Sequence, residues 1–189
     1  LTNAYHAART DSILKSFDAA HPHGVVSIRD IPDVFTRRTH RIGGFPLSLD
    51  DLEHGLIRPL FKDPRAHFVV NCASVSCAPL PGQALSGRTL ESQLEYAART
   101  TLSSPAYVQL EVNRLSVSKL LDWFGADFTT PGYHGAEKSL ALYLKKYVSG
   151  EVAGFIAAHP DPPITFMDYD WSLNRATRPP LQDSPFEGR

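Results

Sequence analysis

Hydrophobic and polar positions along the chain follow two periods, one typical of helices and one typical of short strands. Apolar residues at helical spacing predict helices at 3–20, 48–58, 90–102, 136–148 and 151–158, with a helical turn at 119–124 and a loop at 125–135. Runs of β-branched and aromatic residues predict strands at 25–28, 34–42, 45–48, 68–70, 107–110, 114–117 and 164–167. Gly43-Gly44 suits a two-residue hairpin turn, and a second hairpin is expected around 111–113. The pattern predicts an α+β fold with a central, mostly antiparallel sheet flanked by helices.

The stretch 65–82 joins a short strand signal to both cysteines of the chain. The apolar run 68–70 predicts a strand buried on both faces, which belongs in the middle of a sheet. Cys72 would end this strand, and the prolines that follow Cys77 forbid regular structure. Because side chains alternate along a strand, His67 and Cys72 are expected on opposite faces. A thiol at the point where a core strand enters a loop is both well positioned and accessible.

Length and composition favour one folded domain. The 189 residues, 42% of them hydrophobic, suffice for one core, which we assign to 1–174. The segment 175–189 is polar and without pattern, and it is expected to be a tail without structure of its own. A formal net charge of −1, with scattered basic residues, argues against nucleic acid and anionic membranes as partners. No apolar run approaches the roughly 20 residues of a membrane span.

The predicted helix that begins at Ser48, its N-cap, carries a carboxylate on its apolar face. Glu53 lies inside the arc formed by the leucines and the isoleucine of this helix, and His54 lies at the edge of that arc. A buried carboxylate costs on the order of several kcal/mol unless it is paired. Glu53 therefore needs a partner, either an imidazole of the cysteine site or an arginine such as Arg58 or Arg65.

The chemistry available to the chain centres on its cysteines and histidines. Cysteine attack needs a thiolate, a neighbouring base, and a group that orients the second ring nitrogen of the base. His54 suits the role of base better than His67, which the strand pattern turns away from Cys72. We therefore assign Cys72 as nucleophile, His54 as base and Glu53 as the residue that orients His54. Alternatives stay open: an inert Cys72 and a Cys77 in a local disulfide, or a surface His54 and a Glu53 that braces an arginine.

Four sequence blocks carry a resemblance to a known family. They are NAYHA (3–7), SLDDLEHG (48–55), DPRAHFVVNCASVSC (63–77) and YDWSLN (169–174). Together they resemble the DUF547 family, a domain of unknown function, over about 3–174. The resemblance implies a papain- or transglutaminase-like version of the α+β fold, and a cysteine-peptidase-like or transglutaminase-like activity. It also implies an extracytoplasmic location, periplasmic or secreted.

The resemblance distinguishes the two cysteines. In the family the first cysteine is retained where the second becomes serine, which implies that Cys72 rather than Cys77 is the functional thiol. This chain departs from the family at His6, where an asparagine is usual, and at Ala78, which replaces the first of two prolines.

The leading hypothesis is a cysteine-dependent acyl-transfer enzyme that hydrolyses or exchanges amide bonds of a peptide, protein or glycan substrate. Backbone N–H groups at 74–76 are expected to form an oxyanion site. The supporting residues, some from the pattern and some from the resemblance, are Asn3, His67, Asn71, Ser74, Ser76 and Asp170. The alternative is a non-catalytic module that binds a peptide or glycan. A metal site built from Cys72, His54 and His67 lacks a recognisable ligand spacing, and we expect neither a metal nor a cofactor.

Overall fold

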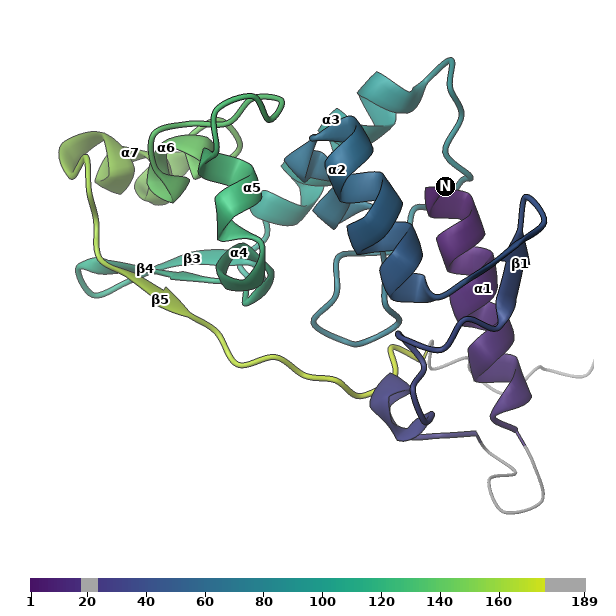
Figure 1. Ribbon diagram of the computed structural model, residues 1–189. Helices are drawn as coiled ribbons and strands as arrows, with labels where there is room; N and C mark the ends of the chain where they lie inside the picture. The colour runs from purple at the N-terminus through teal and green to yellow at the C-terminus, as the bar shows by residue number, and fades with distance from the viewer. Residues whose placement is uncertain (18–23, 176–189) are drawn as a thin grey trace, which may run out of the picture.

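The computed structural model of the protein describes residues 1–17 and 24–175 (Figure 1). Its α-helices are α1 (Thr2–Lys15), α2 (Arg58–Phe61), α3 (Leu90–Leu102), α4 (Leu120–Trp123), α5 (Gly125–Thr129), α6 (Leu140–Leu144) and α7 (Gly150–Ala158). The strands are β1 (His40–Ile42), β2 (Phe45–Leu47), β3 (Val108–Glu111), β4 (Arg114–Val117) and β5 (Ile164–Phe166). Two 3-10 helices, η1 (Ile28–Asp30) and η3 (Pro64–Phe68), and one π-helix, η2 (Asp51–Ile57), complete the elements. This mixture confirms the predicted α+β class.

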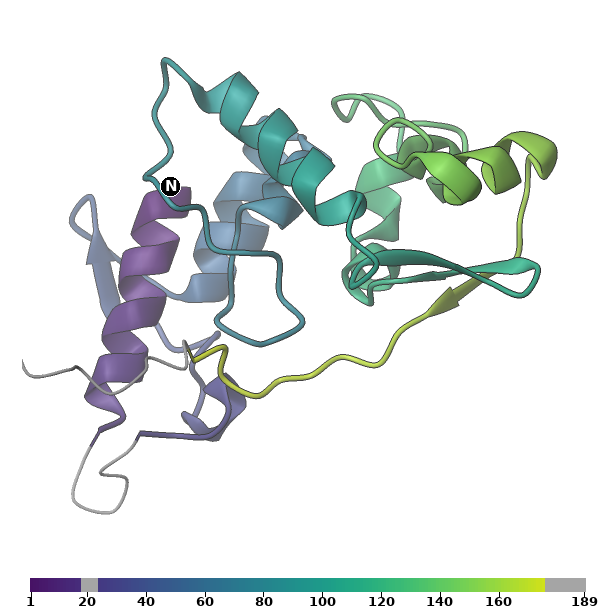
Figure 2. The ribbon, with the colours of Figure 1, turned by 180° about the vertical axis from the view of Figure 1, so that it is seen from behind.

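Two hydrophobic clusters form the interior. One is built from α1, η1, η2 and the β1–β2 hairpin, and the other from α3, the sheet β3–β5 and α4–α7. Figures 1 and 2 show the two groups of elements side by side, with β1 and the sheet β3–β5 at opposite ends of the molecule. The η3 turn joins them, because its Ala66 packs in the first cluster and its Phe68 in the second.

The predicted central sheet is wrong. The described strands form a two-stranded sheet, β1–β2, and a three-stranded sheet in the order β3-β4-β5. The pairings β1–β2 and β3–β4 are antiparallel, whereas β4 and β5 run parallel. Each strand has only three or four residues, so neither sheet extends across the molecule. The space between the clusters is taken up by helices and by the loop that carries both cysteines, called here the cysteine loop (71–78) (Figure 1).

The predicted strand at 68–70 is wrong as well, and with it the expectation that His67 and Cys72 lie on opposite faces of a strand. Asp63 caps a 3-10 helix here, since its Oδ1 accepts the backbone N–H of Arg65 at 3.0 Å. Pro64 occupies the first turn, where its missing N–H costs nothing. The run 68–70 is buried because it passes between two cores, and a turn satisfies that burial as well as a strand does.

The helix expected at 48–58 forms, but over Asp51–Ile57 it is a π-helix, whose turns are wider than those of an α-helix. Ser48 caps it as predicted: its hydroxyl accepts the N–H of Asp51, and its own N–H donates to the Asp51 carboxylate, both at 3.0 Å. Pro59 does not end the helix, which continues through α2 to Phe61. A proline crowds the preceding turn, and the wider π-helical turn η2 before Pro59 leaves room for its ring.

Sequence periodicity located most of the other elements. Helix α3 has its predicted bounds, the two hairpins form, and Gly43 and Gly44 have φ angles of 59° and 87°, as the turn requires. Helix α6 is shorter than predicted, and α5 lies inside the expected loop at 125–135. At 25–28 there is a single bridge, Ser27 to Ser172, followed by η1. The end of the first predicted helix and the tail predicted at 175–189, except Arg175, lie outside the described residues.

Helical spacing places Ala4, Ala7, Leu14 and Phe17 on one apolar stripe of the helix predicted at 3–20, but α1 buries a different face. Tyr5, Ala8 and Arg9 are buried, whereas Leu14 and Phe17 are 64% and 49% exposed. The prediction failed because a polar residue, Arg9, lies at the centre of the buried face. Within 1–17 and 24–175, no helix is long and apolar enough to cross a membrane.

The chain after β5 returns from one cluster to the other. This return segment (167–175) runs alongside the cysteine loop, as both ribbon views show. Val75 N–H donates to Ser172 O at 2.9 Å, and Asn174 N–H donates to Ala73 O at 2.8 Å. The return segment therefore forms part of the environment of Cys72.

Candidate active site

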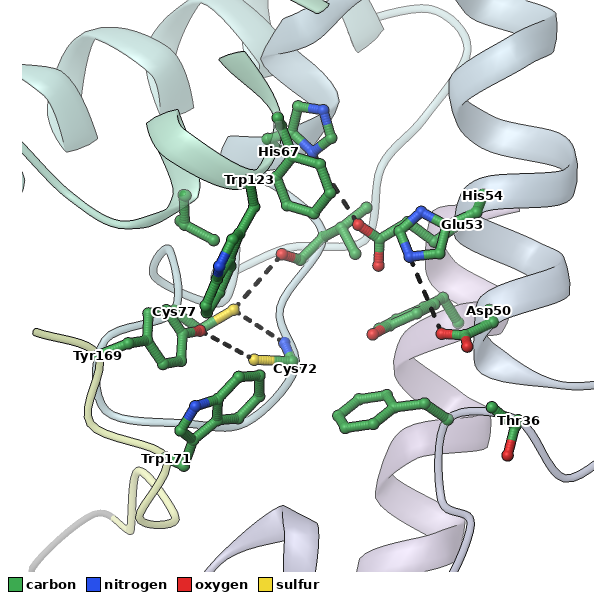
Figure 3. Close-up of a pocket in the computed structure, with 15 residues that line it drawn as sticks. Thr36, Asp50, Glu53, His54, His67, Cys72, Cys77, Trp123, Tyr169 and Trp171 are labelled. Carbon is green, nitrogen blue, oxygen red and sulfur yellow. Dashed lines mark hydrogen bonds and ion pairs between the residues drawn. The ribbon is translucent and has the colours of Figure 1, made fainter. Parts of the chain in front are cut away.

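A pocket of about 350 Å³ lies between the two clusters (Figure 3). Its acidic, histidine and cysteine lining residues are Asp50, Glu53, His54, His67, Cys72 and Cys77. Its aromatic lining includes Phe35, Trp123, Phe124, Tyr169 and Trp171. The structure thus brings the three proposed catalytic residues and His67 to one cavity, although they come from two segments of the chain.

Cys72 belongs to a small hydrogen-bonded cluster. Its Sγ lies 3.0 Å from Ser74 Oγ and 3.3 Å from the Tyr169 hydroxyl, and these two oxygens are 2.7 Å apart. The next residue, Ala73, has a φ of 72°, a left-handed conformation that an alanine rarely adopts. The sharp turn at Ala73 is what allows Ser74 to fold back on the thiol. Ser74 is thereby placed at the site, as the sequence analysis expected.

Cys77 lies beneath Cys72 as a second free thiol. Its Sγ accepts the backbone N–H of Cys72 at 3.0 Å and lies 3.7 Å from the carbonyl of Val70, and only 4% of the residue is exposed. Hydrogen bonding with Cys77 lowers the pKa of Cys72 to about 6, and the Ser74 and Tyr169 hydroxyls act in the same direction against the effect of burial. The same interaction, together with burial, raises the pKa of Cys77. Cys72 is therefore the thiol that ionises first.

Asn71 braces the cysteine loop from inside. Its Oδ1 accepts the N–H of Ala73 at 2.9 Å, and its Nδ2 donates to Ala78 O at 2.6 Å. The buried guanidinium of Arg9 bonds both the Asn71 carbonyl, at 3.2 Å, and its side-chain oxygen. The Asn71 N–H donates to His6 Nε2 at 3.2 Å, and burial lowers the pKa of His6 to about 4, which keeps this ring nitrogen an acceptor. Asn71 supports the site by shaping the loop, outside the pocket itself.

Glu53 faces the pocket from η2, with 14% of its side chain exposed. The imidazole nearest to it is that of His67, whose Nδ1 is 4.0 Å from Glu53 Oε1. Burial raises the pKa of Glu53 to about 7, and the nearby Cys72 adds to this, while Arg58 and the Tyr5 hydroxyl oppose it. A carboxyl with this pKa exchanges its proton near neutral pH.

His67 is held on its other side. Its Nε2 lies 2.8 Å from Asp127 Oδ2, and its ring stacks on Phe124 at 4.0 Å with an interplanar angle of 7°. Arg58 donates to both oxygens of Asp127, at 2.8 and 3.0 Å. Burial raises the pKa of Asp127, but the hydrogen bonds from His67 and Arg58 outweigh it and hold that pKa well below its usual range. Burial lowers the pKa of His67 itself.

His54 lies at the edge of the pocket with 42% of its side chain exposed. Its Nε2 is 3.9 Å from Asp50 Oδ1, and its Nδ1 is 3.3 Å from Arg58 Nη1. Within the described part of the chain, His54 makes no hydrogen bond to Cys72 or Glu53. The carboxylate beside His54 is thus that of Asp50. The role of His54 as the base stays a prediction. Burial lowers the pKa of His54.

The other expected supports lie outside the pocket. Helical spacing places Asn3 on the apolar stripe of the first helix and so predicts that it is buried, which is wrong: Asn3 is exposed and bonds the backbone N–H and carbonyl of Leu85, both at 2.9 Å. Ser76 and Asp170 join the cysteine loop to the return segment, with Asp170 N–H donating to Ser76 Oγ at 2.9 Å. The N–H groups of Val75 and Ser76 donate to the return segment as well, which corrects the expectation that they form an oxyanion site. The N–H of Ser74 faces the Cys72 sulfur instead.

The chain matches one known protein family. The family described as "Protein of unknown function, DUF547" matches residues 1–101, more than half of the chain. The chain belongs to the DUF547 family. No curated protein and no solved structure matches it. The DUF547 match includes Glu53, His54, His67 and Cys72, and it ends before Asp127.

In this DUF547 protein, sequence patterns gave no role at the site to Trp123, Asp127, Tyr169 and Trp171, and they indicated Arg58 only as a possible partner of Glu53. Asp127 and Arg58 complete the polar chain behind His67, and Trp123, Tyr169 and Trp171 form the aromatic wall. Asp127 lies in a segment expected to be a loop, and nothing in its local sequence indicated a partner 60 residues away. The block YDWSLN did contain a signal for Tyr169 and Trp171. In 1–17 and 24–175, no three His, Cys, Asp or Glu side chains gather as a metal site would require.

Alkylation by iodoacetamide is expected to show the lowered pKa of Cys72 directly. The labelling rate of the native protein should rise with pH and reach half its maximum near pH 6, because only the thiolate reacts. Tyr169→Phe removes one hydroxyl from the sulfur and should shift this midpoint to higher pH. Tyr96→Phe, at a residue that is 72% exposed, is the matched control. A midpoint near pH 9 in the native protein would refute the assignment.

Proposed function

We propose that this pocket is the active site of a cysteine-dependent acyl-transfer enzyme that hydrolyses or exchanges amide bonds. One observation carries the proposal. A thiol with a lowered pKa and a carboxyl with a raised pKa line the same pocket from different walls. The pKa values of both groups are shifted toward neutral pH. The thiol can therefore supply a nucleophile and the carboxyl can supply a proton, as acid–base chemistry requires.

Cys72 is the proposed nucleophile. Its thiolate is stabilised by the Cys77 thiol and the Ser74 and Tyr169 hydroxyls, so attack does not depend on an imidazole in contact with the sulfur. The Ser74 N–H and these hydroxyls, which face the Cys72 sulfur, are the proposed donors to an oxyanion that would form at a carbonyl on Cys72.

Glu53 is the proposed proton donor to the leaving amine. It is protonated in part at neutral pH and lies in the same pocket. His67, fixed by Asp127, is a positioning residue for Glu53. His54, the base of the sequence-based hypothesis, lies at the pocket edge, where it can carry protons between Glu53 and solvent.

Other parts of the proposal rest on the family resemblance. These are the papain- or transglutaminase-like arrangement, the peptide, protein or glycan substrate, and the extracytoplasmic location, periplasmic or secreted. The pocket lining favours binding of an acyl group with an apolar or aromatic side chain, because much of this lining is aromatic.

A second candidate function is a binding module without catalysis. The rings of Trp123, Tyr169 and Trp171 have centroids 4.6 to 5.6 Å apart and form a continuous aromatic surface. Sugar and aromatic rings pack well on such surfaces. An enzyme releases product repeatedly and a binding module does not, so a measurement of turnover distinguishes the two functions.

The test uses an activated ester, p-nitrophenyl 3-phenylpropanoate, with intact-protein mass spectrometry. The wild-type protein should form a hydroxylamine-sensitive acyl adduct that maps to Cys72, and it should release more than one equivalent of acid per chain. Cys72→Ala should abolish the adduct, and Cys77→Ser should retain it, since Cys77 only assists. A stable adduct without turnover would favour the binding module. An adduct on Cys77 that survives Cys72→Ala would reverse the two roles.

A further inference from the structure

Two walls of different chemistry face each other across the pocket (Figure 3). Cys72 lies on one wall, beside Tyr169 and Trp171 of the return segment. The opposite wall carries Asp50 and Glu53 from the start of the helix that contains η2. A molecule that fills the space between the walls therefore meets the sulfur on one side and two carboxyl groups on the other.

The pocket lacks a compensating positive charge. Among the described residues that line it, none is a lysine or an arginine. The nearby guanidinium of Arg58 is taken up by the two oxygens of Asp127. Burial lowers the pKa of both His54 and His67, which disfavours a positive charge on either ring. The carboxyl wall therefore favours a cation from the substrate.

The two carboxyl groups differ in how far their side chains are exposed to solvent. Asp50 is 42% exposed at the mouth of the pocket, and Glu53 is 14% exposed further in. A cation entering from solvent would meet Asp50 first and then reach Glu53. The aromatic side chains around this route add the attraction of their ring faces for an ammonium group.

We infer that the second substrate of this site is a primary alkylammonium, which Asp50 and Glu53 bind and which accepts the acyl group from Cys72. This inference rests on the proposed acyl-transfer function and makes the protein a transferase rather than a hydrolase. A lysine side chain and a small free amine share this chemistry.

The proposed reaction has two stages, acylation of Cys72 and transfer of the acyl group to the amine. The Cys72 thiolate attacks the donor carbonyl, the C–S bond forms, the C–N bond breaks, and the Glu53 carboxyl gives its proton to the departing nitrogen. The acceptor ammonium then returns one proton to the Glu53 carboxylate. The neutral amine attacks the thioester, the new C–N bond forms, and the thiolate leaves. The donor amine has left the pocket before this attack and takes up a proton from water, and the remaining proton of the acceptor nitrogen passes to water, so that the protons balance.

The experiment measures how the acyl-enzyme divides between water and amine. The protein is acylated with p-nitrophenyl 3-phenylpropanoate in the presence of monodansylcadaverine, N-acetyl-lysine methylamide, or a dansyl alcohol of the same chain length. The ratio of amide or ester product to free acid is then measured. We expect saturable amide formation with both amines and no ester from the alcohol. Comparing N-acetyl-lysine methylamide with monodansylcadaverine, whose one free amine ends a plain alkyl chain, distinguishes a lysine side chain from a small free amine as the preferred source.

Asp50→Asn should lower the amide-to-acid ratio about tenfold at subsaturating amine, because a charged hydrogen-bond partner of the ammonium is lost. Asp161→Asn, an exposed position outside the pocket lining, makes the same change in net charge and should leave the ratio unchanged. Equal ratios in these two variants, or acid alone at every amine concentration, would overturn the inference while the acyl-transfer function stands. Absence of any adduct on Cys72 would overturn both.

Discussion

Asn71→Ala should lower the free energy of unfolding by about 3 kcal/mol, because the buried polar groups that its side chain pairs, among them a charged guanidinium, lose this partner. Asn71 is 3% exposed and holds three groups at once: the Arg9 guanidinium, the Ala73 N–H and the Ala78 carbonyl. Alanine leaves all three without this partner, and the buried charge of Arg9 is the most costly of them. Urea denaturation followed by circular dichroism measures the loss.

A double variant separates the two parts of this loss. Arg9→Met removes the buried charge, so Asn71→Ala combined with Arg9→Met should recover part of the stability that Asn71→Ala loses. The loop should remain loosened in the double variant, because Ala73 and Ala78 still lack the Asn71 side chain. Cys72 labelling by iodoacetamide would then lose its low-pH midpoint. A change of less than about 1 kcal/mol for Asn71→Ala would show that the loop keeps its shape without this brace.

Glu53→Gln should reduce acyl turnover by about 10²–10⁴-fold, the usual contribution of a general acid. The amide keeps the shape of the side chain and cannot deliver the proton. Iodoacetamide labelling of Cys72 should persist, since the thiolate is stabilised by Cys77, Ser74 and Tyr169 rather than by Glu53. This pairing of lost turnover with retained labelling distinguishes a proton donor from a residue that activates the thiol.

The same variant should change how stability depends on pH. The pKa of Glu53 is raised from 4.5 to about 7 in the folded protein, so its favourable contribution is complete below pH 4.5 and is lost as pH rises through 7. The loss amounts to about 3 kcal/mol. Glutamine does not ionise, so Glu53→Gln should gain about 3 kcal/mol relative to wild type between pH 4 and pH 8.

Glu151→Gln, at an exposed position in α7, is the control and should show no such gain. Thermal melts of the three proteins at both pH values make the comparison. A Glu53→Gln protein that is less stable than wild type at both pH values, with unchanged turnover, would make Glu53 a structural brace and refute its catalytic role.

Local sequence signals located the elements that depend on local physics. The Gly43-Gly44 turn forms because only glycine adopts two consecutive positive φ angles without strain. The Ser48 cap and the α3 helix follow from side-chain hydrogen bonding and from periodicity over several turns. The sequence also singled out the segments that carry Glu53, His54 and Cys72, which line one pocket.

Periodicity was insufficient where an element is short or where partners are distant. Over 68–70 an apolar run is compatible with any buried conformation, and the two cores that meet there selected a 3-10 turn instead of a strand. The face of α1 was mistaken because Arg9 is buried by its bonds to Asn71, 62 residues away.

The sequence by itself determined the α+β class, the hairpins, the longer helices and the choice of Cys72 and Glu53 as the residues of interest. Only the tertiary structure decided which groups surround them. His67 rather than His54 lies beside Glu53, Asp127 fixes His67, and Tyr169 reaches Cys72 from the return segment. Hydrogen bonds and desolvation act over a few ångströms in space regardless of separation along the chain, so the pKa values that define this site could not be read from spacing alone.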